Sequence, residues 1–390
     1  MNRLAIYLLA FGSFLMGTAE FVVAGILDTI SKDLDISISL AGQLVTVYSL
    51  SFAFGSFALV LFTSKFDRKK VLLSTIIVFL MGNMIAFFSY HFELLMLSRI
   101  VLAVSGGLYT VVATNFAAKI TSPEQKGSAI ATVITGFSVS LVLGVPIGTL
   151  IAAYMDWRYI FMIIAIVTFL LLISIYNVIP QMKGTAQISI IHQLQIIKDK
   201  RVISALLTTL FWILGYTMLF TYISSLLQKF AGFSIELVSL CLLILGVFAF
   251  LGSRFGGYAV DKWGSVRTIS ISLIIHATAL FLITNVLSTF ALLLAVIMIW
   301  GAAAWTTTPA NQFYLILLQP KFSETVLSFN TTIMNIGMTL GAGLGGLVIE
   351  YKSILHLGWI GGLMVMTAFI TTIYSFLLNK KKELVVEIQI

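Results

Sequence analysis

A carboxyl group that could exchange a proton, and a basic side chain that could assist it, lie where charge is most costly for this chain. Among its 23 basic and 15 acidic residues, Glu20 and Arg99 fall well inside long apolar runs. At ~1.5 Å per residue, Glu20 stands roughly 24 Å from the start of its run and Arg99 roughly 7–8 Å from the start of another. If the two runs cross an apolar layer about 30 Å thick in opposite directions, these depths nearly coincide. We therefore expect an acid and a base to lie close together inside the layer.

The chemistry of such a pair has two interpretations. A charge at mid-depth costs about 2.5–3.5 kcal/mol on membrane-insertion scales, so an intramembrane acid and base are functional candidates by default. In one interpretation, the Glu20 carboxyl group binds and releases protons beside Arg99. In the other, the two residues form a structural salt bridge that locks two helices. Small residues recur at three- to four-residue spacing on both runs, and this pattern permits close helix approach or lines a cavity.

The elements that would position this pair are membrane-spanning helices. Charged residues make up 10% of the chain and hydrophobic residues 59%, with a mean hydropathy of +1.07, whereas soluble domains contain about 25% charged residues. Twelve apolar runs of about 20 residues are long enough to cross a bilayer as helices. They are 4–27, 40–63, 71–90, 94–117, 128–153, 158–179, 202–227, 236–259, 268–287, 290–316, 325–349 and 357–378. The sequence therefore predicts an all-α membrane protein with twelve transmembrane helices.

The placement of the basic residues predicts the orientation of these helices. With the amino terminus in the cytoplasm, eighteen of the 23 Lys and Arg residues fall on the cytoplasmic side and four on the other, and Arg99 lies between them. An excess of Lys and Arg in cytoplasmic loops is the usual pattern of membrane proteins. We therefore predict a multi-pass protein of the cell membrane, with both termini in the cytoplasm and the lipid bilayer as its surroundings. The net charge of +8 then reflects topology and not nucleic-acid binding.

An internal repeat divides the chain in two. Gly144 and Gly341 are 197 residues apart, as are Gly148 and Gly345. One offset shared by separate landmarks predicts two pseudo-symmetric six-helix bundles, an arrangement typical of secondary transporters with a central site. The predicted domains are an N-terminal bundle at 1–180, a cytoplasmic linker at 181–201, and a C-terminal bundle with a short basic tail at 202–390.

Other functional classes find little support in the sequence. It contains no phosphate-binding P-loop, no H-E-x-x-H metal motif and no G-x-S-x-G nucleophile motif. An intramembrane enzyme would need paired catalytic groups, for which only Glu20 and Arg99 qualify, and a channel would need rings of charged residues or pore-loop carbonyls. Cys241 is the single cysteine, so it can form neither an intramolecular disulfide nor a cysteine metal site. We expect a monomeric transporter that is not an enzyme and binds no cofactor or metal.

Candidate solute-binding residues are aromatic and amide side chains near the middle of the predicted helices. The candidates are Tyr48, Phe137, Trp212, Tyr216, Trp305 and Asn335. Aromatic faces stack well on planar rings. A sugar would need more polar partners than these residues supply, because each buried hydroxyl group requires a hydrogen bond. The set therefore favours a planar solute.

Several motifs resemble those of the major facilitator superfamily. The stretch 256–267, expected as a loop, resembles the superfamily pattern G-x-x-x-D-[KR]-x-G-x-x-[KR]. Its matching residues are Gly257, Asp261, Lys262, Gly264 and Arg267. The equivalent stretch at 60–70 departs from the pattern, with Ser64 in place of the acid. The resemblance implies that the five matching residues take part in conformational change.

Two further motifs and one arginine carry the same resemblance. Gly144-x-Pro146-x-Gly148 resembles the fifth-helix antiporter motif of exporters, and a proline inside a span bends its helix. Arg99, followed by Ser105-Gly106, resembles the fourth-helix arginine motif, and residues 156–161 read D-W-R-x-x-F. We expect the three residues of the antiporter motif, and Gly341 as the repeat of Gly144, to serve conformational change.

The closest resemblance within the superfamily is to the drug:proton antiporter branch. The stretches 20–27, 33–37 and 41–44 resemble arabinose-type and purine base or nucleoside efflux permeases. This resemblance implies export of a small organic solute in exchange for protons. Purine bases or nucleosides are the first expectation, a multidrug or antibiotic efflux pump is the alternative, and sugar efflux is the third choice.

Overall fold

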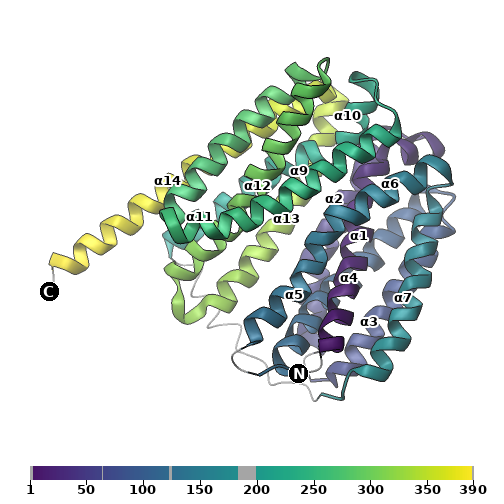
Figure 1. Cartoon of the computed structure of the whole chain (residues 1–390), viewed down its shortest axis with the longest axis horizontal. Helices are drawn as coiled ribbons and strands as arrows, with labels where there is room; N and C mark the ends of the chain where they lie inside the picture. The colour runs from purple at the N-terminus through teal and green to yellow at the C-terminus, as the bar shows by residue number, and fades with distance from the viewer. Residues whose placement is uncertain (1–2, 64, 123–124, 183–198, 389–390) are drawn as a thin grey trace. The chain divides into compact units, whose positions relative to one another are not determined.

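A computed structural model describes residues 3–63, 65–122, 125–182 and 199–388, and every regular element in these ranges is a helix (Figure 1). The first half of the chain contains α1 (Arg3–Asp33), α2 (Ile38–Thr63), α3 (Arg68–Phe87), α4 (Phe92–Lys119), α5 (Lys126–Val139), a π-helical turn (Ser140–Gly144), α6 (Val145–Tyr154) and α7 (Arg158–Val178). The second half contains α9 (Lys200–Phe220), α10 (Ile223–Phe230), α11 (Ile235–Ile283), α12 (Phe290–Leu318), α13 (Ser323–Tyr351) and α14 (Leu357–Ile388). Short 3₁₀ turns occur at Thr284–Val286, Pro320–Phe322 and Ile354–His356.

The helices agree with the apolar runs of the sequence. Eleven helical segments in the described ranges are long and apolar enough to cross a membrane, which confirms an all-α membrane protein. One of them, α11, holds the predicted run 236–259 and most of the run 268–287 in 49 residues. At ~1.5 Å per residue a helix of that length would measure roughly 74 Å, more than twice the ~30 Å core of a bilayer.

The prediction that residues 256–267 form a loop is wrong. Helical backbone angles continue through this stretch and fail only at Gly264, where φ is 79° and ψ is 161°. Glycine adopts a positive φ without the steric cost that a Cβ atom imposes. A single residue therefore redirects the chain, and the polar side chains of Asp261, Lys262 and Arg267 stay exposed on helix.

The chain divides into two compact units. Unit 1 comprises Met1–Gln187 and Thr221–Leu243, and unit 2 comprises Ile188–Phe220 and Ile244–Ile390. Unit 1 thus includes α10 and the first turns of α11, which the sequence analysis assigned to the C-terminal bundle. Most of the predicted linker falls on residues 183–198, which lie outside the described residues.

Glycine stripes bring helices into close contact within each unit. In unit 1, Cβ atoms added at Gly144 and Gly148 would overlap side chains of α1, and α5 and α6 lie along α1 in Figure 1. In unit 2, a Cβ atom at Gly341 would lie 2.6 Å from the carbonyl oxygen of Leu214 on α9. Helices therefore approach closely at these glycines in both units.

A π-helical turn at Ser140–Gly144 precedes Pro146. The N–H of Val145 donates to the carbonyl oxygen of Ser140, five residues earlier. Proline removes one helical hydrogen bond and its ring clashes with the carbonyl four residues before it, and the wider π turn accommodates that strain. Such turns are rare and often mark functional sites. The sequence analysis predicted a bend here but not this turn.

Candidate functional site

Arg99 lies fully buried on α4, where it ties three helices of unit 1 together. Its Nη1 and Nη2 atoms donate to the carbonyl oxygens of Ala19 (2.6 Å) and Glu20 (3.0 Å) on α1. Its Nε atom donates to the carbonyl oxygen of Leu44 on α2, at 3.3 Å. These three bonds hold a positive charge between α1, α2 and α4, and no ion pair of Arg99 is found among the described residues.

The face of the Arg99 guanidinium lies on the ring of Tyr48. The distance from Cζ of Arg99 to the ring centroid is 4.2 Å, which is within the range of a cation–π contact. Tyr48 is fully buried on α2, and its hydroxyl group has no hydrogen-bond partner. The structure therefore places this predicted solute residue against the arginine.

Glu20 lies beside Arg99, as its depth in the sequence predicted, but the contact differs from the expected one. Arg99 binds the backbone carbonyl of Glu20, and the two side chains, both within the described residues, form no ion pair. Three of the five N–H donors of the arginine bind carbonyl oxygens instead. The Glu20 side chain is 7% exposed, and its Oε2 atom is buried without a partner.

This arrangement can exchange a proton. A carboxylate buried without hydrogen bonds carries a large desolvation cost, whereas the neutral acid carries much less. The positive charge of Arg99 nearby reduces the cost of the charged form, because opposite charges a few ångströms apart attract strongly away from water. Burial therefore stabilises the neutral form of Glu20, and the charge of Arg99 stabilises its charged form.

The remaining aromatic candidate in unit 1 lies on another helix. Phe137 is half-buried on α5, with its ring edge-on to that of Phe21 at a centroid distance of 6.2 Å. A Cβ atom at Gly17 would lie 3.1 Å from the Phe137 ring. Phe137 thus packs on α1 about one turn from Glu20, on the side of α5.

The aromatic candidates of unit 2 form one cluster around Tyr216. Its ring centroid lies 6.2 Å from that of Trp305, 5.2 Å from that of Trp300 and 5.3 Å from that of Phe220. Trp212 joins the cluster through His276, which lies 6.3 Å from both Trp212 and Tyr216. Three of the predicted solute residues are therefore brought together.

Two polar members of unit 2 differ in their surroundings. His276 is fully buried and accepts a hydrogen bond at Nε2 from Nε1 of Trp300, at 3.2 Å. As a single histidine in an apolar run, it was expected to pack and was not included among the site residues. Asn335 on α13 donates instead to the Thr331 carbonyl of its own helix, at 3.0 Å.

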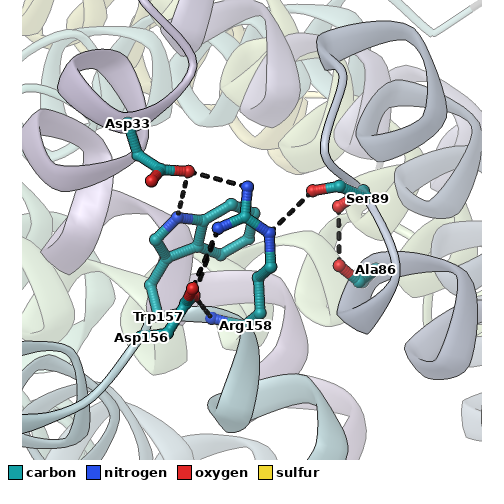
Figure 2. A network of polar contacts seen from close by, with 6 residues as sticks. All are labelled: Asp33, Ala86, Ser89, Asp156, Trp157 and Arg158. Atoms are coloured by element: carbon teal, nitrogen blue, oxygen red, sulfur yellow. Dashed lines mark hydrogen bonds and ion pairs between the residues drawn. The ribbon is translucent and has the colours of Figure 1, made fainter.

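Arg158 joins the ends of several helices in unit 1 (Figure 2). It forms ion pairs with Asp33 at 2.7 Å and with Asp156 at 3.2 Å, and its Nε donates to the Ser89 carbonyl at 2.8 Å. The Trp157 indole donates to the same Asp33 carboxylate, at 3.2 Å. The D-W-R motif thus fastens the start of α7 to the end of α1 and to the turn between α3 and α4.

Comparison with known proteins decides the family. The family model described as Major Facilitator Superfamily matches residues 9–321 and 232–387. The chain belongs to the major facilitator superfamily. It is an MFS-type transporter and a multi-pass membrane protein, as two curated relatives indicate.

Those relatives cover nearly the whole chain. YbcL of Bacillus subtilis (strain 168), an uncharacterized MFS-type transporter, is 37% identical over 383 residues, which are 98% of each protein. YtbD of the same strain, also an uncharacterized MFS-type transporter, is 32% identical over 386 residues, which are 97% of each.

Solved structures show the same fold. A crystal structure of a D-xylose-proton symporter superposes with a TM-score of 0.81 over 95% of this chain and 97% of that one, at 15% identity. A partially occluded inward-open structure of the xylose transporter XylE from E. coli gives 0.74 over 94% and 96%, also at 15% identity.

The superfamily loop motif has one residue with a clear structural requirement, namely Gly264 with its positive φ. A Cβ atom at Gly257 would meet no atom within 4 Å. The Lys262 ammonium donates to the Tyr258 hydroxyl at 3.2 Å. The exposed Asp261 and Arg267 enter none of the ion pairs found among the described residues.

A second buried acid on α1 escaped the sequence analysis. Asp28 is 1% exposed and pairs with Lys32 at 2.6 Å and with Lys229 of α10 at 3.7 Å, all within unit 1. The spacing of four residues between Asp28 and Lys32 was the available signal. Lys229 could not be foreseen, since about 200 residues separate it from Asp28 in the sequence.

Proposed function

We propose that the protein is a proton-coupled secondary transporter that exports a small planar solute in exchange for protons. The observation that carries the proposal is the Glu20 carboxyl group, buried with an unpartnered oxygen beside Arg99. An ionisable side chain inside a membrane-spanning helix raises the free energy of insertion, and such side chains usually belong to a pathway for ions, protons or solute.

The proposed cycle begins with a proton that enters from the outside. It neutralises Glu20, which favours one orientation of the transporter. Solute binding in the opposite orientation favours release of the proton to the cytoplasm. A membrane potential supplies about 2.3 kcal/mol per charge per 100 mV for this exchange.

The proposed topology has twelve membrane crossings in two six-helix bundles in the cell membrane, with both termini in the cytoplasm. Counting α11 as two crossings joined at Gly264 supports the number twelve, because its 49 residues exceed the length of a single crossing. The basic residues, eighteen of 23 on one side, support the orientation. In this topology Asp28 and Asp33 lie toward the outside.

Purine bases or nucleosides are the proposed solutes. Among the predicted aromatic residues, Phe137 and Trp305 are only half-buried and could stack on a planar ring, whereas Tyr48, Trp212 and Tyr216 are buried. Among the predicted solute residues none carries a formal charge, which favours a planar heterocycle over a charged solute. A multidrug or antibiotic efflux pump is the alternative, and sugar efflux is the third choice.

Overproduction of the protein in a bacterial host tests the solute class. Cells should resist toxic purine analogues and excrete hypoxanthine-like compounds into the medium. Cells with the Glu20→Gln variant at the same membrane level are the matched control and should do neither. Resistance confined to antibiotics or dyes, with unchanged purine excretion, would replace the purine proposal with the multidrug alternative.

A further inference from the structure

Tyr48 reaches the part of α1 that carries Glu20. A Cβ atom added at Gly106 on α4 would lie 3.4 Å from the Tyr48 hydroxyl oxygen and 3.8 Å from Cβ of Met16. The hydroxyl group and Met16 therefore contact the same position of α4. Met16 precedes Glu20 by one helical turn on the same face of α1.

A hydroxyl donor and a carboxyl acceptor in this region are both unused. The Tyr48 hydroxyl and Oε2 of Glu20 are both buried without a hydrogen-bond partner. Three of the five N–H donors of Arg99 bind carbonyl oxygens, and one face of its guanidinium lies on the Tyr48 ring. Glu20 and Arg99 are the two charged groups that act electrostatically on the Tyr48 hydroxyl.

The other charged groups packed on α1 are engaged elsewhere. Lys229 of α10 pairs with Asp28, about two turns beyond Glu20. Arg158 of α7 pairs with Asp33, farther along the same helix. Near Glu20, Phe137 of α5 and Ser140 of the π turn pack on α1 at Gly17, and neither side chain titrates near neutral pH.

We propose that Tyr48 is the hydrogen-bond donor that stabilises the deprotonated Glu20 carboxylate. This inference rests on the proposed function, in which Glu20 exchanges protons. When Glu20 releases its proton to water, the Tyr48 O–H turns toward the new carboxylate and donates to it. The bonds of Arg99 to the α1 and α2 carbonyls stay intact, because the ring that carries the hydroxyl group also holds the guanidinium. Tyr48 is thus a positioning residue of the proton site.

Infrared titration of the purified protein in liposomes tests this role without any solute. The carboxylic C=O stretch of Glu20 is identified as the band that the Glu20→Gln variant lacks, and its midpoint is followed against pH. Tyr48→Phe keeps the ring on Arg99 and removes only the hydroxyl group. The charged form loses its donor, so the midpoint should rise by about one to two pH units, which corresponds to one hydrogen bond to a charged group.

Tyr109→Phe is the matched control. Tyr109 is a buried tyrosine of α4 whose hydroxyl donates to the Leu9 carbonyl, at 2.9 Å. Its removal should leave the Glu20 midpoint unchanged. An unmoved midpoint in Tyr48→Phe, or an equal shift in both variants, would overturn the role of Tyr48 while leaving the proton exchange of Glu20 in place.

Two further outcomes are decisive. If no titrating band is missing in Glu20→Gln, Glu20 does not exchange protons, and the proposed function fails together with the inference. If Tyr48→Phe does not fold, the unmodified protein with isotope-labelled tyrosine gives the answer. A phenol C–O band should then shift in step with the Glu20 titration, and a constant phenol band would overturn the inference.

Discussion

The substitution Arg99→Lys separates the geometry of the arginine from its charge. Lysine keeps the positive charge but offers one nitrogen in place of a rigid fork. The carbonyls of Ala19 and Glu20 lie on α1, whereas that of Leu44 lies on α2. A single ammonium group can keep one of these three bonds at good geometry, so two are lost.

The expected loss follows from those two bonds. Hydrogen bonds to charged groups contribute about 1.5–3 kcal/mol each. The lower end of this range applies for two reasons. Each of these carbonyls still accepts a hydrogen bond from the N–H four residues later in its own helix, and the bond from Nε is already long at 3.3 Å. We therefore expect the free energy of unfolding to fall by about 3 kcal/mol, and proton-driven transport to fall with it.

Equilibrium unfolding in mixed micelles measures the stability, and solute efflux from the same preparations measures activity. Arg267→Lys is the control, since Arg267 is exposed and should tolerate the change within about 0.5 kcal/mol. If Arg99→Lys matched the wild type in both stability and efflux, the three carbonyl bonds would have no part in holding the site.

Two further predictions concern glycine. Gly144→Leu and Gly341→Leu should each impair transport, because a bulky side chain would push α1 away from α6 in one variant and α9 away from α13 in the other. Normal efflux from both variants would show that close packing at these glycines is not needed. Gly264→Ala should lower the free energy of unfolding by about 1–3 kcal/mol because alanine is strained at this φ, and unchanged thermal unfolding would show that the chain can turn here without glycine.

The helices and the central pair were predictable because their signals are local. Apolar length alone placed the predicted run 158–179 on α7 (Arg158–Val178). The depths of Glu20 and Arg99 in their runs predicted that the two would lie together, which the contact of 3.0 Å between Nη2 of Arg99 and the Glu20 carbonyl confirms. Each of these predictions needed only distance along a helix.

The details of the site were not predictable because they depend on tertiary contacts. Backbone carbonyls have no sequence signature, so the sequence could not reveal that Arg99 binds three of them and leaves the Glu20 carboxylate free. Asp28 stands near the end of its apolar run and is buried only through the folding of unit 1. Similarly, the turn at Gly264 was expected as a loop, because exposed polar residues on a helix resemble loop residues in sequence.

Proton-driven accumulation by the Glu20→Gln variant tests the central claim most directly. Proteoliposomes with an acidic interior are placed in a neutral bath that contains radiolabelled hypoxanthine, and both accumulation and solute exchange at equal pH are measured. We predict that the wild type concentrates the solute, while Glu20→Gln loses accumulation but keeps exchange, because glutamine has nearly the same shape and cannot bind and release a proton. Accumulation by Glu20→Gln against its concentration gradient, at the wild-type level, would contradict the assignment of proton coupling to Glu20.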